Sequence, residues 1–149
     1  MLLDYLDPEL IRFHVPAQDW QDAVQKGGGL LVRQGICTQA YVDACISAVT
    51  TLGPYMVLSP GIALAHSRPE DGALQVGMSI ITLDPPVNFG SKANDPVRLL
   101  ITFCGIDHES HIGMLQELAI FLMEDANQQF LLNVTTVEDL TNYLQNLKG

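Results

Sequence analysis

The chain has 149 residues, 48% of them hydrophobic and 16% charged, which is enough apolar material for a folded core and opposite to the composition of a disordered chain. Its formal net charge is −10, from 17 acidic and 7 basic residues, and the scattered Lys and Arg argue against nucleic acid and anionic membranes as partners. No apolar run is long enough to span a bilayer, and the first residues lack the pattern of a signal peptide. We therefore expect one cytoplasmic domain over residues 1–149, with no membrane insertion.

Three cysteines, Cys37, Cys45 and Cys104, form no C-x-x-C pair and leave one thiol over. This spacing argues against a disulfide framework or a cysteine zinc site. All three have apolar neighbours in the sequence, so we expect buried, inert thiols rather than reactive ones.

The first half of the chain has the pattern of one strand and two helices. These are, in chain order, a strand over residues 10–15, a helix capped by Asp19, and a helix from Thr38 to Gly53. Gly27, Gly28 and Gly29 lie inside the apolar stripe of the first helix. Because glycine is a poor helix former, that helix is expected either to pack closely there or to be interrupted.

The second half has the pattern of several strands followed by two helices. The expected strands cover residues 55–58, 62–65, 76–83 and 97–105, and the helices start at Asp107 or Ser110 and at a capping box from Thr135 to Glu138. Prolines, including Pro85-Pro86, separate the strands. The whole order predicts an α/β fold, with a mixed central sheet flanked by helices on both faces, in a single domain.

No nucleotide-binding glycine motif and no G-x-S-x-G is present, so the four histidines are the main candidates for chemistry. Histidine is a neutral nucleophile near pH 7, because its ordinary pKa is about 6.5. His66 stands at the exit of the apolar strand 62–65, and Arg68, two residues on, could pair with phosphate oxygens. From position alone, a strand-terminal histidine beside a solvated arginine is the favoured interpretation.

His111 lies in the first turn of the helix that Asp107 would cap, where free N–H groups and the helix dipole favour an anion. If His66 and His111 face each other, one imidazole can attack phosphorus while the other donates a hydrogen bond to an equatorial oxygen. The alternative is that His111 packs locally at the helix start.

A metal site is a further alternative, because His108 and His111 are three residues apart and have carboxylates beside them. With His66 they could serve a metal-dependent hydrolase. However, three or four ligands must converge on a metal, and no H-E-x-x-H or similar pattern occurs. We expect no metal, and we expect His14, on the polar face of the first strand, to be exposed.

Residues 53–70 read GPYMVLSPGIALAHSRPE, and this segment resembles the active-site stretch of the EIIA domains of the bacterial phosphoenolpyruvate-dependent sugar phosphotransferase system, mannitol–fructose class. Residues 19–23, 94–97 and 110–113 fall where that family has its other landmarks, so the likeness covers essentially the whole chain. The Gly-Pro-Tyr start and the Arg-Pro-Glu after the histidine are most similar to the ascorbate and cryptic-mannitol branches.

The resemblance implies that His66 takes a phosphoryl group on Nε2 from the phosphohistidine of HPr and passes it to a cognate EIIB protein or domain. His111 would assist, and no cofactor is implied. We expect Arg68 and Ser67 to bind the phosphoryl group. A regulatory phosphoprotein of the nitrogen-related EIIA type, which signals rather than feeds transport, is the alternative function.

Two positions depart from the family pattern. Most relatives have a proline where this chain has Ala65, so the backbone entering His66 lacks a fixed φ. The mannitol relatives also bring an arginine from the helix before the active-site strands, and residues 50–53 contain none. Arg68 is the candidate substitute.

Overall fold

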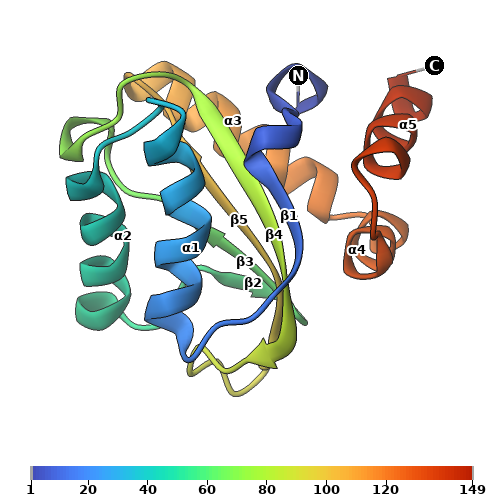
Figure 1. Ribbon diagram of the computed structural model, residues 1–149, viewed down its shortest axis with the longest axis horizontal. Coiled ribbons are helices and arrows are strands. Elements are labelled where there is room, and N and C mark those ends of the chain that lie inside the picture. Colours follow the sequence, from blue (N-terminus) through green and yellow to red (C-terminus); the bar gives the residue numbers. More distant parts are fainter. Residues whose placement is uncertain (1, 149) are drawn as a thin grey trace.

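A computed structural model describes residues 2–148 and shows one five-stranded sheet between two helical layers (Figure 1). The strands, in chain order, are β1 Ile11–Val15, β2 Val57–Ser59, β3 Ile62–Ala65, β4 Gly77–Val87 and β5 Val97–Cys104. Their order across the sheet is β1-β4-β5-β3-β2. β1 with β4 and β3 with β5 are parallel, whereas β4 with β5 and β2 with β3 are antiparallel, so the sheet is mixed as expected.

Helices cover both faces of this sheet, and each face has its own apolar core. The helices are α1 Trp20–Arg33, α2 Gln39–Leu52, α3 His108–Leu122, α4 Asp125–Asn133 and α5 Val137–Lys148, with short 3-10 turns at Leu2–Tyr5, Pro8–Leu10 and Pro69–Asp71. α1 and α2 bury their apolar stripes on one face, and α3, α4 and α5 cover the other (Figure 1). The predicted fold class is therefore confirmed.

The start of α1 and its glycines follow the sequence pattern. Asp19 accepts a hydrogen bond from the Asp22 N–H at 2.8 Å and so caps the helix. α1 is uninterrupted, and a Cβ on Gly28 would lie 2.6 Å from Cγ2 of Val42 in α2. Close packing thus explains Gly28, because only a residue without a side chain lets the two helices approach so far. A Cβ on Gly27 would instead meet Thr102 of the sheet at 3.0 Å, and one on Gly29 would meet nothing within 4 Å.

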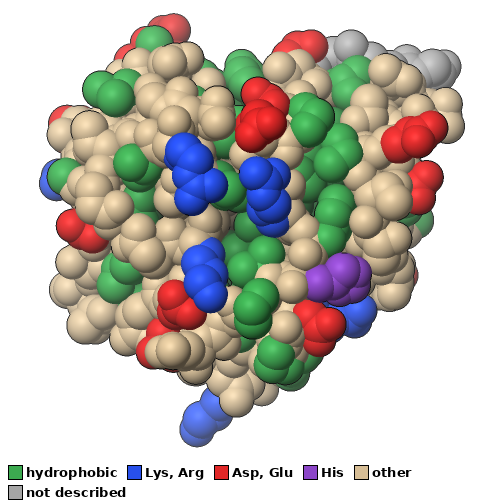
Figure 2. All heavy atoms as spheres, viewed as in Figure 1, with side chains coloured by type: hydrophobic (Ala, Val, Ile, Leu, Met, Phe, Trp, Pro, Cys, Tyr) green, Lys and Arg blue, Asp and Glu red, His purple; other side chains and the backbone are tan. Residues whose placement is uncertain are grey.

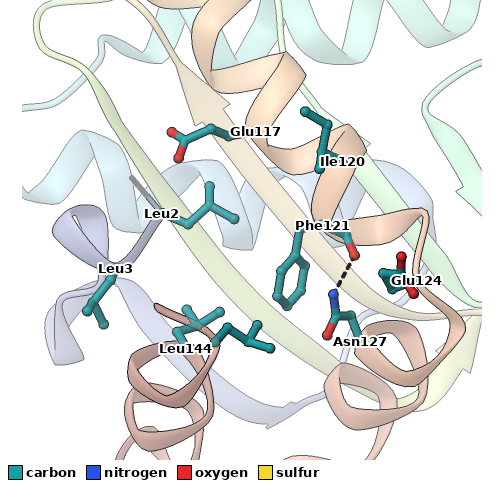
Figure 3. A pocket seen from close by; sticks show the side chains of 9 residues that line it. Leu2, Leu3, Glu117, Ile120, Phe121, Glu124, Asn127 and Leu144 are labelled. Carbon is teal, nitrogen blue, oxygen red and sulfur yellow. Dashed lines mark hydrogen bonds between the residues drawn. The ribbon is translucent and has the colours of Figure 1, made fainter. Parts of the chain in front are cut away.

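The helix α4 was missed, because its sequence is polar and no side chain caps its start. Tertiary hydrogen bonds hold it instead. Asn127 Nδ2 donates to the Phe121 carbonyl at 2.8 Å (Figure 3), and Gln128 Nε2 donates to the Leu122 carbonyl at 2.6 Å, so both side chains satisfy the end of α3. Tyr143 of α5 donates to Asn127 Oδ1 at 2.6 Å.

Several element boundaries also differ from expectation: the strand expected at 55–58 is Val57–Ser59, and two other differences have a clear structural reason. β4 continues through Pro85 and Pro86, because Val87 still pairs with Val97 beyond a register shift that accommodates the prolines. The cap of α5 is Thr136, whose hydroxyl accepts from the Asp139 N–H at 3.1 Å, one residue later than the predicted capping box.

The structure also places the basic side chains, the three thiols and His14. On the face in Figure 2, several Lys and Arg side chains lie near one another in the middle, with acidic side chains beside them, and others lie apart at the edges. Cys37, Cys45 and Cys104 are free and buried, as predicted. His14 is exposed and lies 3.6 Å from an Asp84 carboxylate oxygen. None of the helices within residues 2–148 is long and apolar enough to cross a bilayer.

Candidate functional site

The ring of His66 lies just beyond the end of β3, where the parallel strands β3 and β5 separate. It stacks on the buried Phe103 of β5, with ring centroids 4.9 Å apart and an interplanar angle of 15°. Tyr55 meets the imidazole edge-on at 6.1 Å. A rigid strand and an aromatic ring therefore fix where this imidazole points, at the carboxyl end of β3.

His111 reaches the same place from the first turn of α3. Its ring centroid is 5.4 Å from that of His66 and 5.6 Å from that of Phe103. Gly105, directly after β5, makes this approach possible, because a Cβ there would lie 2.4 Å from the His111 backbone nitrogen. The structure thus brings together the two histidines that the sequence singled out.

The surroundings of both imidazoles favour the neutral form. Burial lowers the pKa of His66, and the nearby His111 lowers it further, while the Leu64 backbone opposes this shift. The pKa of His111 is also lowered, first by burial and then by His108. Nδ1 of each ring is buried without a hydrogen-bond partner among residues 2–148, which leaves Nε2 as the nitrogen on the open side.

Ser67 and Arg68 lie at the site, but acidic neighbours hold both side chains. Ser67 Oγ donates to Asp71 Oδ2 at 2.5 Å. Arg68, whose side chain is 76% exposed, pairs with Asp71 at 3.3 Å and with Glu70 at 3.5 Å. The Ser67 hydroxyl and then the guanidinium hold the pKa of Asp71 below its ordinary value. A phosphoryl group would have to compete with these carboxylates for both donors.

The N-terminus of α3 likewise carries its own anion. Asp107 Oδ1 accepts from the Ser110 N–H at 2.8 Å, and this bond lowers the pKa of the carboxyl group. Ser110 Oγ in turn accepts from the Asp107 N–H at 3.2 Å and from the Ile106 N–H at 2.9 Å. This capping box orders the turn that carries His111, but it already places a negative charge at the positive end of the helix dipole.

Two hollows open beside the histidines. One of about 490 Å³ is lined by both rings together with Tyr55, Arg68 and the outer face of α2. The other, of about 580 Å³, contains Glu70 and His108 and shares Arg68 and His111 with the first. The apolar side chains of Leu52, Tyr55 and Ile106 are exposed around them. The site is therefore an open, partly apolar surface rather than an enclosed cavity.

A third hollow, of about 340 Å³, lies between the N-terminal turn, α3, α4 and α5 (Figure 3). Leucine, isoleucine and phenylalanine side chains dominate its walls, and it holds none of the predicted site residues. Among residues 2–148, no group of three or more His, Cys, Asp or Glu side chains is arranged to hold a metal ion. Within the same residues, the alternative of a metal-dependent hydrolase with His66, His108 and His111 therefore has no group of side chains that could bind its metal ion.

Three residues of the site were not identified from the sequence. Tyr41 and Phe103 lie inside the predicted helix 38–53 and the predicted strand 97–105, and Gly105 is the last residue of that strand, but none of the three was singled out. The stacking of Phe103 and the contact of Gly105 depend on residues that are distant in the chain. The hydroxyl of Tyr41 is the one signal of a site contact in the sequence, because a polar atom on a buried helix face needs a hydrogen-bond partner.

Comparisons with known proteins agree with this geometry. Residues 4–147 match the model of the family described as "Phosphoenolpyruvate-dependent sugar phosphotransferase system, EIIA 2". The ascorbate-specific PTS system EIIA component of Shigella boydii is 40% identical over 117 residues, which cover 77% of this chain and 76% of that protein.

Solved structures show the same similarity. The mannitol-specific cryptic phosphotransferase enzyme IIA from Escherichia coli has a TM-score of 0.85 at 34% identity, covering 95% of this chain and 97% of that one. Enzyme IIA of the mannitol system, solved in complex with phosphorylated enzyme IIB from Escherichia coli, has a TM-score of 0.81 at 26% identity, with the same coverage. The resemblance to the ascorbate and cryptic-mannitol branches is confirmed, and the chain belongs to the EIIA 2 family of the phosphoenolpyruvate-dependent sugar phosphotransferase system.

Proposed function

We propose that this protein is a phosphocarrier in which His66 accepts a phosphoryl group from the phosphohistidine of HPr and passes it to a cognate EIIB of an ascorbate-type sugar system. The observation that carries the proposal is the pair of imidazoles, His66 and His111, 5.4 Å apart at an open surface, each with Nδ1 buried. The lowered pKa of His66 keeps the ring neutral, and therefore nucleophilic, at cellular pH.

The transfer is an in-line displacement between two imidazoles. The Nε2 lone pair of His66 forms a bond to phosphorus as the bond from phosphorus to the donor imidazole breaks, and the donor ring leaves neutral. The proton on Nδ1 of His66 stays in place on the buried side of the ring. His111 is positioned to donate a hydrogen bond from Nε2 to a phosphoryl oxygen, so catalysis rests on positioning and on electrostatics.

The surroundings of the histidines suit a transient protein partner. Exposed Leu52, Tyr55 and Ile106 supply apolar contact area, and small side chains of α2 leave the His66 ring accessible. Glu70 and Asp107 add negative charge on one side, which favours a partner with basic residues at that place. An interface of this kind is expected to be small and weak, as a carrier with two successive partners needs.

Transport is favoured over the regulatory alternative by the similarity to a relative that is named an ascorbate-specific component. The complex of the mannitol enzyme IIA with phosphorylated enzyme IIB supports an EIIB partner. The two roles differ in the next step, because a transport component must donate its phosphoryl group to a sugar-specific EIIB.

The test is incubation with phosphoenolpyruvate, enzyme I and HPr, followed by measurement of the intact mass. We expect an acid-labile gain of one phosphoryl group that is absent in His66→Ala and unchanged in His14→Ala, since His14 is an exposed histidine at the far end of β1. Addition of the ascorbate EIIB should then remove the label from the wild type. Equal labelling of His66→Ala and the wild type would overturn the proposal.

A further inference from the structure

The hydroxyl group of Tyr41 joins the two chain segments that carry the stacked rings of the site. Tyr41 is fully buried in α2. Its Oη donates to the Phe103 carbonyl at 2.7 Å and accepts from the Ser67 N–H at 3.0 Å. Phe103 carries the ring on which the imidazole stacks, and Ser67 shares a peptide plane with His66. One buried hydroxyl is thus bonded to both sides of the stacked pair.

The hydrogen bonds between β3 and β5 explain why the hydroxyl is needed. At the start of this parallel pair, the Leu99 N–H donates to the Gly61 carbonyl at 3.0 Å. Such bonds recur along a parallel pair at steps of two residues, so the odd-numbered residues make them here. The paired register ends where Ala65 lies beside Thr102.

One more step of this pattern would join the Ser67 N–H directly to the Phe103 carbonyl. Tyr41 Oη lies between these two groups instead, accepting from the first and donating to the second. The side chain therefore replaces one backbone bond and keeps the two strand ends apart by the width of an oxygen atom. The imidazole of His66 and the open hollow beside it occupy the place where the strands separate.

We propose that Tyr41 is a positioning residue for phosphoryl transfer, whose hydroxyl fixes the His66–Ser67 peptide and the Phe103 backbone so that the imidazole stacks with Nε2 outward. This inference rests on the proposed function of His66. Tyr41 does not touch the phosphoryl group, because its side chain is fully buried. Its removal changes where the nucleophile stands rather than the chemistry of the nucleophile.

Substitution by phenylalanine leaves the Ser67 N–H and the Phe103 carbonyl without their shared partner. The strand ends must then either close on each other, which moves His66, or leave two buried polar groups unbonded. A shift of the reacting atom by about 1 Å is enough to slow a transfer by up to about a hundredfold. A loss of positioning lowers kcat, whereas the docking surface for HPr stays unchanged.

The experiment compares Tyr41→Phe with Tyr143→Phe. Both variants remove one hydrogen-bonded hydroxyl, but that of Tyr143 binds Asn127 Oδ1 on the opposite helical layer. We expect Tyr41→Phe to lower kcat for phosphoryl uptake about tenfold or more per folded molecule, with KM for phospho-HPr unchanged. The pH midpoint of the His66 ring resonances should rise in Tyr41→Phe and stay fixed in Tyr143→Phe. Equal rates and equal midpoints in the two variants would overturn the inference.

Two further outcomes are decided by other measurements. If Tyr41→Phe does not fold, hydrogen exchange of the Ser67 amide in the wild type decides: strong protection supports the bridge, and exchange at the rate of an unstructured peptide overturns it. If the wild type takes no phosphoryl group from phospho-HPr, the proposed function fails. The His66 midpoint in Tyr41→Phe then still shows whether the hydroxyl positions the ring.

Discussion

Replacement of Gly105 by alanine should disturb the site without touching either imidazole. The new Cβ would lie 2.4 Å from the His111 backbone nitrogen and 2.6 Å from its Cα. Ordinary contacts between such atoms begin near 3.4 Å, so the first turn of α3 or the end of β5 must move by about 1 Å. Both groups in conflict are backbone, and no flexible side chain can relieve the overlap.

The expected effects are a loss of stability and a slower transfer. Overpacking of this kind costs about 1–3 kcal/mol, which for a chain of this size lowers the melting temperature by several degrees. Displacement of His111 by about 1 Å should reduce the rate of phosphoryl uptake from phospho-HPr about tenfold to a hundredfold. Thermal unfolding and single-turnover labelling measure the two effects separately.

Gly113→Ala is the matched control, because Gly113 lies in the same helix and a Cβ there meets nothing within 4 Å. Alanine at this helical position should stabilise the protein by about 0.5–1 kcal/mol and leave the transfer rate unchanged. If Gly105→Ala were as stable and as fast as Gly113→Ala, the contact between Gly105 and His111 would not position the second histidine.

Two further predictions concern charge at the site. Because burial and His111 lower the pKa of His66, the rate of phosphoryl uptake should stay constant as the pH falls to about 6.5 and decline only below that value, as the ring becomes protonated. The stability that the neutral His66 ring contributes to the fold is present above its ordinary pKa and is lost as the pH falls through its lowered pKa. A pH midpoint of 6.5 or higher for the His66 ring resonances would contradict the lowered pKa. Arg68→Ala should slow transfer less than His66→Ala and barely change the melting temperature, since the guanidinium is exposed and already paired with Asp71 and Glu70. Uptake as fully abolished as in His66→Ala would show instead that Arg68 is indispensable.

Local patterns made the fold and the two histidines predictable. Asp19 and Asp107 cap helices where the sequence indicated, because an N-cap acts within one turn and needs no distant partner. The apolar strand before His66 and the helix start before His111 placed both residues at the ends of elements, and the structure then showed that the two rings face each other. The mixed sheet followed from the order of the elements.

What the sequence could not show depends on contacts between distant segments. α4 has no capping signal of its own, and Asn127 became helical through bonds to α3 and α5. The Ser67 hydroxyl and the Arg68 guanidinium were predicted to face a phosphoryl group, but Asp71 holds both in this structure. Binding of a phosphoryl group by Ser67 and Arg68 therefore stays a prediction.

The carboxylates of Asp71 and Asp107 affect how strongly free inorganic phosphate can bind at the site. Asp71 is paired with the Arg68 guanidinium, and Asp107 accepts a hydrogen bond at the N-terminus of α3. Each carboxylate therefore occupies a group that would otherwise bind a phosphate dianion. We therefore expect free phosphate to be poorly retained there and not to block His66. On the proposed function, a phosphoryl group bonded to His66 would likewise be held only loosely, so its transfer to the next protein would stay reversible.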